Sequence, residues 1–436
     1  MTDEAQPHGK FQTPRGMHDI LPDDHDYYTV VKKAVRHRCR QAGFRRITTP
    51  IMEEAAVFER GLGADTDAVA KEMYRLEVGN KTYALKPEST AAICRAYLQH
   101  GMGSWPQPVQ LYCFEPHFRH DRPQKGRYRQ FFQTSVEVIG GRDASMDAQG
   151  ILLAQKVFED LMIADRFELH INTIGSPENR RKYEEALKDY FLPKMRNLSE
   201  DSQARVETNP LRIFDSKDED DQILVKLAPK FEDFLSAESK EYYQQVKTYL
   251  DALGIKYTEN PRLVRGLDYY CDTVFEFIDD EGLTVCGGGR YDGLIELLGG
   301  PPTPGYGFAM GIERIITHLR DAGVVPPEKD HVDVYIACLG DIAKAKAMKL
   351  ISDLHDLGVH VRGAFGKASM KSQLKTADKF DAKWTLLLGE VEVREGIIIL
   401  RNMAEGSQER IPFDGIVERV AGLIDPSTRD TWQMGE

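Results

Sequence analysis

The chain has 436 residues, 41% of them hydrophobic, and a formal net charge of −12 at pH 7. This length predicts about three domains, and no apolar run approaches the roughly 20 residues that a membrane-spanning helix needs. The acidic net charge argues mildly against nucleic-acid binding. A local basic cluster can still bind phosphate, because charges act within a Debye length of about 8 Å.

The N-terminal segment MTDEAQPHGK has no apolar stretch of the kind found in secretory signals. The six cysteines are scattered along the chain without a CxxC pair: Cys39, Cys94, Cys113, Cys271, Cys286 and Cys338. This pattern argues against a zinc site or a disulfide framework and is typical of a reducing cytoplasm. We therefore expect a cytoplasmic protein with no membrane association, no zinc and no metal site built from Cys/His clusters.

The first predicted elements follow an extended entry over residues 11–22, FQTPRGMHDILP. An amphipathic helix is predicted from about Asp26 to Gln41, and Ala42-Gly43 ends it. The segment FRRITTPIME predicts a strand that breaks at Pro50. On these residues alone, this is an ordinary unit of one helix and one strand.

A second strand is predicted in YALKPEST, residues 83–90, where it runs through a proline turn into the helix AAICRAYLQHG. Glu88 and Thr90 stand where this helix begins. A serine or threonine at such a place commonly caps backbone N–H groups. Capping is therefore an open alternative to a binding role for Ser89 and Thr90.

Residues 109–139 predict two β-strands around a strongly basic loop. Period-2 alternation places Glu115, His117 and Arg119 on one face of the first strand. It places four residues on one face of the second strand: Phe131, Gln133, Ser135 and Glu137. The arginine-rich loop suits phosphate, because a guanidinium binds phosphate oxygens in pairs and keeps its charge. The hairpin thus predicts the floor of a ligand site, with a solvated basic hairpin as the alternative.

The amino-acid composition and the hydrophobic pattern change in the middle of the chain. A helix, MDAQGILLAQKVFEDL, and a strand, RFELHIN, precede a helical, charged and weakly patterned stretch over residues 175–260. This stretch predicts a helical domain inserted between two halves of a β-rich core. A solvated helical spacer is the alternative.

Two further segments predict strands at a ligand site. Residues 263–291 form an expected antiparallel hairpin in which Arg265 precedes the first strand, Tyr269 and Tyr270 stand at its start, and glycines 287–289 permit a close backbone approach. Residues 305–319 predict a strand of small residues running into a helix that carries Arg314 in its first turns. Glycines 305, 307 and 311 leave space for a flat ring, and Arg314 could lie over it. A glycine run alone is usually a turn, and tight packing would explain the glycines but not the arginine.

After a linker over residues 321–330, strands and helices alternate to the end of the chain. Such alternation predicts a parallel or mixed sheet covered by helices.

The segment FRHDRPQKGRYRQFFQ resembles motif 2 of class II aminoacyl-tRNA synthetases, in the bacterial histidyl-tRNA synthetase form. The helix with FRRITTPIME resembles motif 1 and GYGFAMGIERIITHL resembles motif 3. RGLDYY and CGGGRYDG match the two signatures of histidyl-tRNA synthetases, and they disfavour a prolyl or threonyl enzyme. The resemblance implies an α+β fold: an antiparallel catalytic sheet flanked by helices, a helical insertion and a C-terminal α/β anticodon-binding domain. The implied domains are residues 1–174 and 261–325 for the two parts of the catalytic core, 175–260 for the insertion and 331–436 for the anticodon-binding domain.

The implied activity is that of a homodimeric histidine–tRNA ligase that uses ATP with Mg²⁺, L-histidine and tRNA(His). Arg119 and Arg265 are the implied catalytic cations. The implied histidine-binding residues are Glu88, Thr90, Arg119, Gln133, Glu137, Arg265, Tyr269 and Tyr270. The implied ATP-binding residues are Arg119, Arg127, Phe131 and Arg314, and those for the tRNA acceptor end are Gln124 and Lys125.

Some residues depart from the family pattern. Lys86 and Ser89 replace the usual arginine and glycine, Asp121 replaces a glutamate, and Thr134 and Ser135 stand where a glycine is common. The alternative function is a non-catalytic, histidine-binding relative that acts as a regulatory subunit of ATP phosphoribosyltransferase. That relative usually lacks the C-terminal domain and the arginines, both of which are present here. A pure RNA-binding protein would not need an ATP site.

Overall fold

The computed structural model describes residues 11–63, 66–122, 126–326, 332–363, 366, 369–426 and 429. It divides the chain into two compact units, 1–326 and 327–436. None of the helices in the described part is long and apolar enough to cross a membrane.

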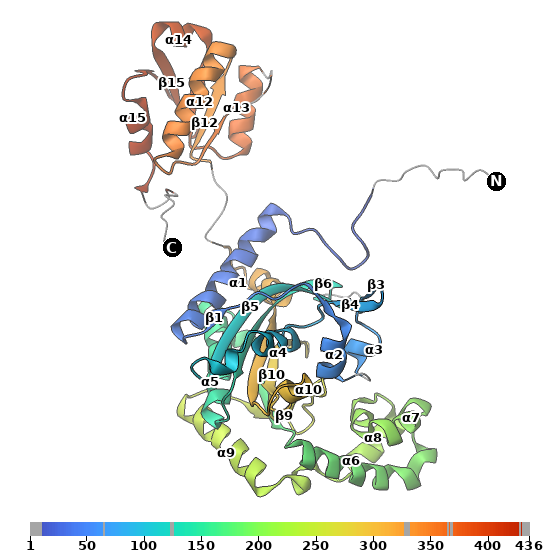
Figure 1. Ribbon diagram of the computed structural model, residues 1–436. Helices are drawn as coiled ribbons and strands as arrows, with labels where there is room; N and C mark the ends of the chain where they lie inside the picture. Colours follow the sequence, from blue (N-terminus) through green and yellow to red (C-terminus); the bar gives the residue numbers. More distant parts are fainter. Residues whose placement is uncertain are drawn as a thin grey trace, which may run out of the picture. The chain divides into compact units, whose positions relative to one another are not determined.

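The first unit is built on an eight-stranded sheet in the order β1-β5-β6-β11-β10-β9-β7-β8. Its strands are β1 (Arg45–Arg46), β5 (Val109–Phe118), β6 (Gln130–Ile139), β7 (Glu168–Thr173), β8 (Thr258–Glu259), β9 (Cys271–Ile278), β10 (Thr284–Arg290) and β11 (Gly305–Gly311). The six central strands pair in antiparallel fashion, whereas β1 and β8 are added in parallel at the two edges. The predicted hairpins β5–β6 and β9–β10 are confirmed (Figure 1).

The segment FRRITTPIME breaks at Pro50, as predicted, but it does not form one strand. It forms two short strands in different sheets, β1 in the large sheet and β2 (Met52–Glu54) in a small sheet of order β2-β4-β3. The other strands of the small sheet are β3 (Arg75–Val78) and β4 (Lys81–Leu85). The chain changes sheet at Pro50, where the residue has no N–H to continue a ladder.

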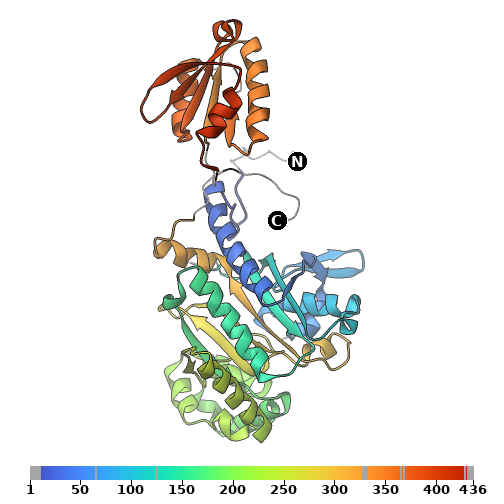
Figure 2. The same ribbon diagram turned by 90° about the vertical axis from the view of Figure 1, so that its left-hand side faces the viewer.

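Helices cover both faces of the large sheet. One face carries the predicted N-terminal helix α1 (Pro22–Gln41), α5 (Ala144–Asp160) and α11 (Ile312–Asp321), which pack on residues such as Val136 and Val138. Figure 2 shows α1 and α5 lying across this face. The opposite face carries α2 (Ala55–Leu62), α4 (Thr90–Gln99) and α10 (Leu294–Leu297), with the short α3 (Asp67–Ala70) and η1 (Met102–Ser104) beside them. The face that bears Glu115, His117 and Glu137 is therefore buried, not open to solvent.

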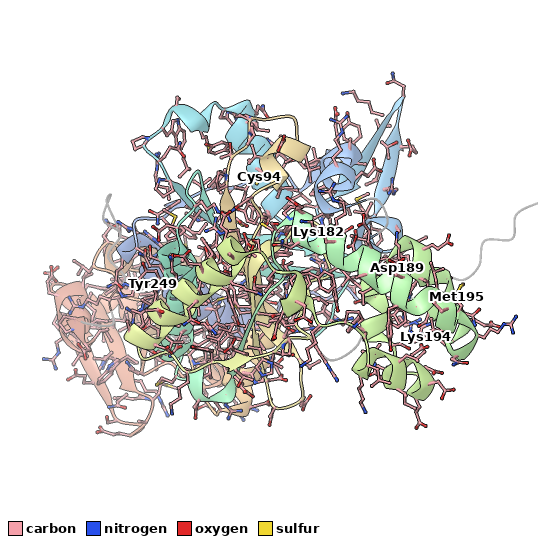
Figure 3. The ribbon with its side chains drawn as sticks, turned by 90° about the horizontal axis from the view of Figure 1, so that it is seen from below. Cys94, Lys182, Asp189, Lys194, Met195 and Tyr249 are labelled. Atoms are coloured by element: carbon pink, nitrogen blue, oxygen red, sulfur yellow. The ribbon has the colours of Figure 1, made fainter. Side chains whose placement is uncertain are left out.

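Residues 177–234 form a helical lobe with its own core, made by Tyr183, Leu187, Phe191, Leu198, Val206, Ile213 and Val225. Its elements are α6 (Pro177–Phe191), η3 (Leu192–Asn197), α7 (Glu200–Thr208), η4 (Pro210–Asp215), α8 (Glu219–Lys226) and η5 (Phe231–Phe234). Figure 3 shows α6 running outward past Lys182 and Asp189 toward Lys194 and Met195. By contrast α9 (Ala237–Ala252), which carries Tyr249, packs through Val246 and Leu250 on the core of the large sheet. The stretch 175–260 thus contains both the lobe and a helix that belongs to the sheet.

The second unit holds a mixed sheet of order β13-β12-β14-β15-β16, as the alternating pattern predicted. Its strands are β12 (Val334–Cys338), β13 (Val361–Gly363), β14 (Trp384–Leu388), β15 (Ile397–Asn402) and β16 (Gln408–Pro412). Its helices are α12 (Asp341–His355), α13 (Met370–Lys379), α14 (Glu390–Glu395) and α15 (Ile416–Gly422). The remaining short helix of the chain, η2 (Ala164–Arg166), precedes β7.

Candidate active site

Glu137 lies at the centre of the site on β6 and is fully buried. Thr90 Oγ1 donates a hydrogen bond to its Oε1 at 2.7 Å, and the Tyr291 hydroxyl donates to its Oε2 at 2.5 Å. Burial raises the pKa of Glu137 to about 8, although the two donors act in the opposite direction. A carboxylate held in this way is fixed in orientation but expensive to ionise.

Tyr291 is a site residue that the sequence reasoning did not single out. It follows directly after the glycine run and Arg290, and its ring is 1% exposed. The ring of Tyr269 lies 5.7 Å from that of Tyr291 and 4.6 Å from that of Tyr270, between centroids. The sequence signal was its place in CGGGRYDG, directly after the glycine run, but its contact with Glu137 joins residues 154 positions apart, which no local pattern records.

Two glycines of β11 make room for these groups. A β-carbon on Gly307 would lie 1.9 Å from Glu137 Oε2, and one on Gly305 would lie 2.2 Å from the Tyr291 ring. The flat-ring space expected at these glycines is thus occupied by Glu137 and Tyr291, whereas Gly311 lies beside Arg314. The glycines of β11 serve the Glu137 pocket because they face it across the ladder.

In the turn before α4, the residue that caps the helix is Glu88, not Ser89 or Thr90. Glu88 accepts hydrogen bonds from the backbone N–H groups of Thr90 and Ala91, at 2.6 and 2.8 Å, and so caps the helix. Ser89 and Thr90 make no capping bond of this kind: Ser89 contacts His117 Nε2 at 2.7 Å, and Thr90 contacts Glu137. Burial raises the pKa of Glu88 as well.

Lys86 and Ser89, which differ from the family pattern, both contact buried side chains. Lys86 is fully buried and pairs with Glu115, while its Nζ also donates to Thr49 Oγ1 at 2.9 Å. Ser89 is held between His117 and the thiol of Cys113. Thr134 Oγ1 donates to the Cys113 carbonyl at 2.7 Å, and Ser135 is buried. Lys86, Ser89 and Thr134 are therefore each paired with a buried group of the same layer.

The predicted phosphate-binding arginines lie around the end of the β5–β6 hairpin. Arg119 Nε donates to the Pro87 carbonyl at 2.9 Å, and its guanidinium carbon lies 5.6 Å from the centroid of the Phe131 ring. Arg127 is half exposed and pairs with Asp121 at 2.9 Å. Gln133 is half-buried on the same face of β6 as Phe131. Gln124 and Lys125 lie outside the described residues.

Arg314 joins three elements near this end of the sheet. Its Nε donates to the Gly126 carbonyl at 3.1 Å, and its Nη1 donates to the Thr284 carbonyl of β10. Burial lowers the pKa of Arg314. Its neighbour Glu313 accepts from Phe132 N at 2.8 Å and from the Tyr28 hydroxyl at 3.1 Å, and burial raises the pKa of Glu313 to about 7. Glu313 lines a cavity of about 350 Å³ on the opposite face of β6 from Glu137.

Arg265 is held against β9 and β10. Its Nη1 pairs with Glu276 of β9, and its guanidinium carbon lies 5.6 Å from the centroid of the Tyr270 ring. Its Nε is buried without a hydrogen-bond partner in the described part of the chain. A β-carbon on Gly287 would lie 2.7 Å from Nη1, so the first glycine of the run gives Arg265 its place.

For the amino-acid activation that the resemblance implies, we expect Gly287→Ala to lower the rate by about tenfold or more, because an added methyl group displaces the guanidinium of Arg265. The measurement is steady-state ATP–pyrophosphate exchange. Gly266→Ala is the matched control, since a β-carbon there meets no atom within 4 Å. Equal rates in the two variants would show that Gly287 does not position Arg265.

One group of potential metal ligands exists in the described part of the chain. Cys271, Asp272 and Asp292 offer ligand atoms within 4.8 Å of one another. Arg142 already pairs with both carboxylates, at 3.1 and 2.6 Å, and Arg290 pairs with Asp292 at 3.0 Å. Two guanidinium groups at this point disfavour a cation, so the cluster fits an ion-pair network better than a metal site.

The antiparallel sheet with its basic hairpin, the strand–helix unit that carries Arg314 and the separate α/β unit together define a class II aminoacyl-tRNA synthetase fold. A family model described as histidyl-tRNA synthetase matches residues 16–315, and one described as anticodon binding domain matches residues 333–423. The chain therefore belongs to the histidyl-tRNA synthetase family, whose members are aminoacyl-tRNA synthetases.

Relatives cover nearly the whole chain. A histidine–tRNA ligase of Dehalococcoides mccartyi is 43% identical over 411 residues, which are 93% of this chain and 98% of that protein. A histidine–tRNA ligase of Staphylococcus aureus is 41% identical over 413 residues, again 93% and 98%. The crystal structure of apo S. aureus histidyl-tRNA synthetase superposes with a TM-score of 0.79 at 36% identity, covering 94% of this chain and 100% of that one.

Proposed function

We propose that this chain is a histidine–tRNA ligase that activates L-histidine with ATP to histidyl-adenylate and then transfers the histidyl group to the 3' end of tRNA(His). The observation that carries the proposal is the buried carboxylate of Glu137, held between Thr90 and Tyr291. A fixed buried acceptor selects a side chain with an N–H group, since any other side chain leaves the remaining lone pairs of the carboxylate without a donor.

The first step joins a carboxylate oxygen of histidine to the α-phosphorus of ATP and releases pyrophosphate. Such a step needs positioning and charge neutralisation more than a protein nucleophile. We assign Arg119 to the α-phosphate and Arg127 to the terminal phosphate. Arg265 would lie between the substrate carboxylate and the α-phosphate, and its unpartnered Nε supports this role. Mg²⁺ enters as the complex with ATP and adds positive charge at the phosphates.

The remaining roles concern recognition. Phe131 and Arg314 would enclose adenine, and Glu88, Thr90 and Gln133 would bind the α-amino group. Glu137 and Tyr270 would each take one imidazole nitrogen, with Tyr269 lining the pocket. Because Glu88 already caps α4 through Thr90 N and Ala91 N, its remaining lone pairs are the ones available to an ammonium group.

For tRNA we propose three contacts. Gln124 and Lys125 would meet the acceptor end, the helical insertion would hold the acceptor arm, and the unit after residue 331 would bind the anticodon. We also propose a homodimer formed through the α1 region, which a sedimentation experiment at micromolar concentration tests, and a cytoplasmic location, which suits six free, buried cysteines.

The test is ATP–pyrophosphate exchange with each of the twenty amino acids. Exchange with histidine alone supports the proposal, and transfer of labelled histidine to tRNA(His) completes it. Absence of exchange together with measurable histidine binding would favour the regulatory relative instead. A Bacillus halodurans structure titled as an ATP phosphoribosyltransferase regulatory subunit/histidyl-tRNA synthetase shares the fold, at 19% identity and a TM-score of 0.58. Two features favour the enzyme over the regulatory relative. One is the match to an anticodon-binding domain, and the other is the presence of Arg119, Arg127, Arg265 and Arg314.

A further inference from the structure

Three segments of the chain meet around Glu137, and each runs directly into a charged residue. Strand β6, which carries Glu137, continues through two glycines to Arg142. Tyr269 and Tyr270 lead through Cys271 to Asp272, and Tyr291 is followed at once by Asp292. The charged residues lie together, behind the pocket that the tyrosines and Glu137 form.

Arg142 connects the other two segments to its own. Its Nη1 donates to Asp292 Oδ2 at 2.6 Å, and its Nη2 donates to Asp272 Oδ2 at 3.1 Å. Its guanidinium carbon also lies 5.4 Å from the centroid of the Tyr242 ring on α9, and Nη2 lies 3.6 Å from Glu238 on the same helix. One side chain thus contacts both tyrosine-bearing segments and the helix that follows the insertion.

The two aspartates are fixed from other sides as well. Asp272 has a φ of +45°, and its backbone N–H and C=O bond to Gly175 and Ile174, at the point where the chain enters the insertion. Its Oδ1 accepts from Ser239 Oγ of α9 at 3.0 Å. Asp292 Oδ1 accepts from Arg290 at 3.0 Å and from Gly305 N at 3.2 Å. Arg142, Asp272 and Asp292 are therefore all paired. Removing a hydrogen bond from Arg142 leaves one of the two aspartates with one partner fewer.

We propose that Arg142 is a positioning residue for the histidine pocket: by bridging Asp272 and Asp292 it sets where Tyr270 and Tyr291 stand relative to Glu137, and it ties that arrangement to α9. The inference rests on the proposed function, because the pocket is assigned to histidine there. The contacts of Arg142, to Asp272, Asp292, Glu238 and Tyr242, include none of the residues assigned to substrate above.

The chemistry requires arginine at this position. A guanidinium presents several N–H groups in one plane and can bridge two carboxylates at once. A lysine ammonium keeps the charge but acts from one point, so it satisfies one aspartate and leaves the other loose. Since Asp272 and Asp292 belong to different segments, losing either bond removes the bridge that Arg142 makes between the segments of Tyr270 and Tyr291, although each aspartate keeps its other partners.

The test is Arg142→Lys in ATP–pyrophosphate exchange, with histidine and ATP varied separately. We expect the KM for histidine to rise by about tenfold, a loss near 1.4 kcal/mol, while the KM for ATP changes by less than about twofold because the ATP-side arginines lie elsewhere. Arg75→Lys is the matched control: Arg75 of β3 is similarly exposed and pairs with Glu59 of α2. It should change neither KM.

A purely structural role would give a different pattern. A lower melting temperature with both KM values unchanged, or both raised equally, would overturn the proposal. Adding Ser239→Ala tests the link to α9: because Ser239 and Arg142 hold the same aspartate, their effects on the KM for histidine should be non-additive. Additive effects would refute that link. If the wild-type protein shows no histidine-dependent exchange, the proposed function fails, whereas wild-type exchange with an unaltered histidine KM in Arg142→Lys refutes only this inference.

Discussion

Glu137→Gln is expected to lower kcat/KM for histidine by about 10²- to 10³-fold, roughly 3–4 kcal/mol of transition-state binding. The amide keeps the size of the side chain and can still accept from Tyr291 and donate to Thr90, so the pocket stays closed. What it loses is the ability to ionise and so to become the charged acceptor that an imidazole N–H would meet. The measurement is exchange kinetics with histidine varied at saturating ATP.

The control is the same chemical change at another buried carboxylate. Glu313→Gln replaces a group on the opposite face of β6, which contacts Phe132 and Tyr28. It should leave the KM for histidine unchanged. A Glu137→Gln protein with wild-type kcat/KM for histidine would rule out Glu137 as the imidazole acceptor.

The same substitution is expected to stabilise the folded protein at high pH. Burial raises the pKa of Glu137 to about 8 from its ordinary value of 4.5, so the native state binds a proton that the unfolded state releases. Stability from this group is therefore present below pH 4.5, declines as pH rises to about 8 and is lost above that. Glutamine does not titrate, so its advantage grows over that window, with an upper limit of about 5 kcal/mol. Urea unfolding of both proteins at pH 5, 7 and 9 measures it. A constant difference across these pH values would contradict the raised pKa.

The second large effect is expected for Arg265→Lys, which should lower the rate of adenylate formation by about 10³-fold, near 4 kcal/mol, with folding intact. Glu276 and the Tyr270 ring orient the guanidinium, and the proposed role needs donors directed at two substrate oxyanions together. A lysine ammonium would pair with Glu276 and leave one oxyanion without a partner.

Single-turnover measurement of adenylate formation tests this, with the melting temperature as the check on folding. Arg262→Lys, at an exposed position in the same segment, is the control and should behave as wild type. Wild-type exchange in Arg265→Lys would remove Arg265 from the catalytic groups.

The sequence by itself determined the fold class and the family, and it supplied most of the residues proposed for the site. Period-2 alternation placed Phe131, Gln133 and Glu137 on one face of β6 because a strand's geometry is local and repeats every two residues. The C-terminal α/β unit was also predicted from local patterns, because each of its strands and helices can be recognised within about a dozen residues. The signatures RGLDYY and CGGGRYDG were specific enough to indicate the family.

Only the tertiary structure decided which partners these residues have. Burial of the polar face, the contact of Tyr291 with Glu137, the pairing of Lys86 with Glu115 and the bridge made by Arg142 all join residues far apart in the chain. No local pattern records such contacts, because a hydrogen bond between strands depends on sheet order and register. The short strands on either side of Pro50 show the same limit: the proline predicts a break, but nothing in the segment reveals that the two strands join different sheets.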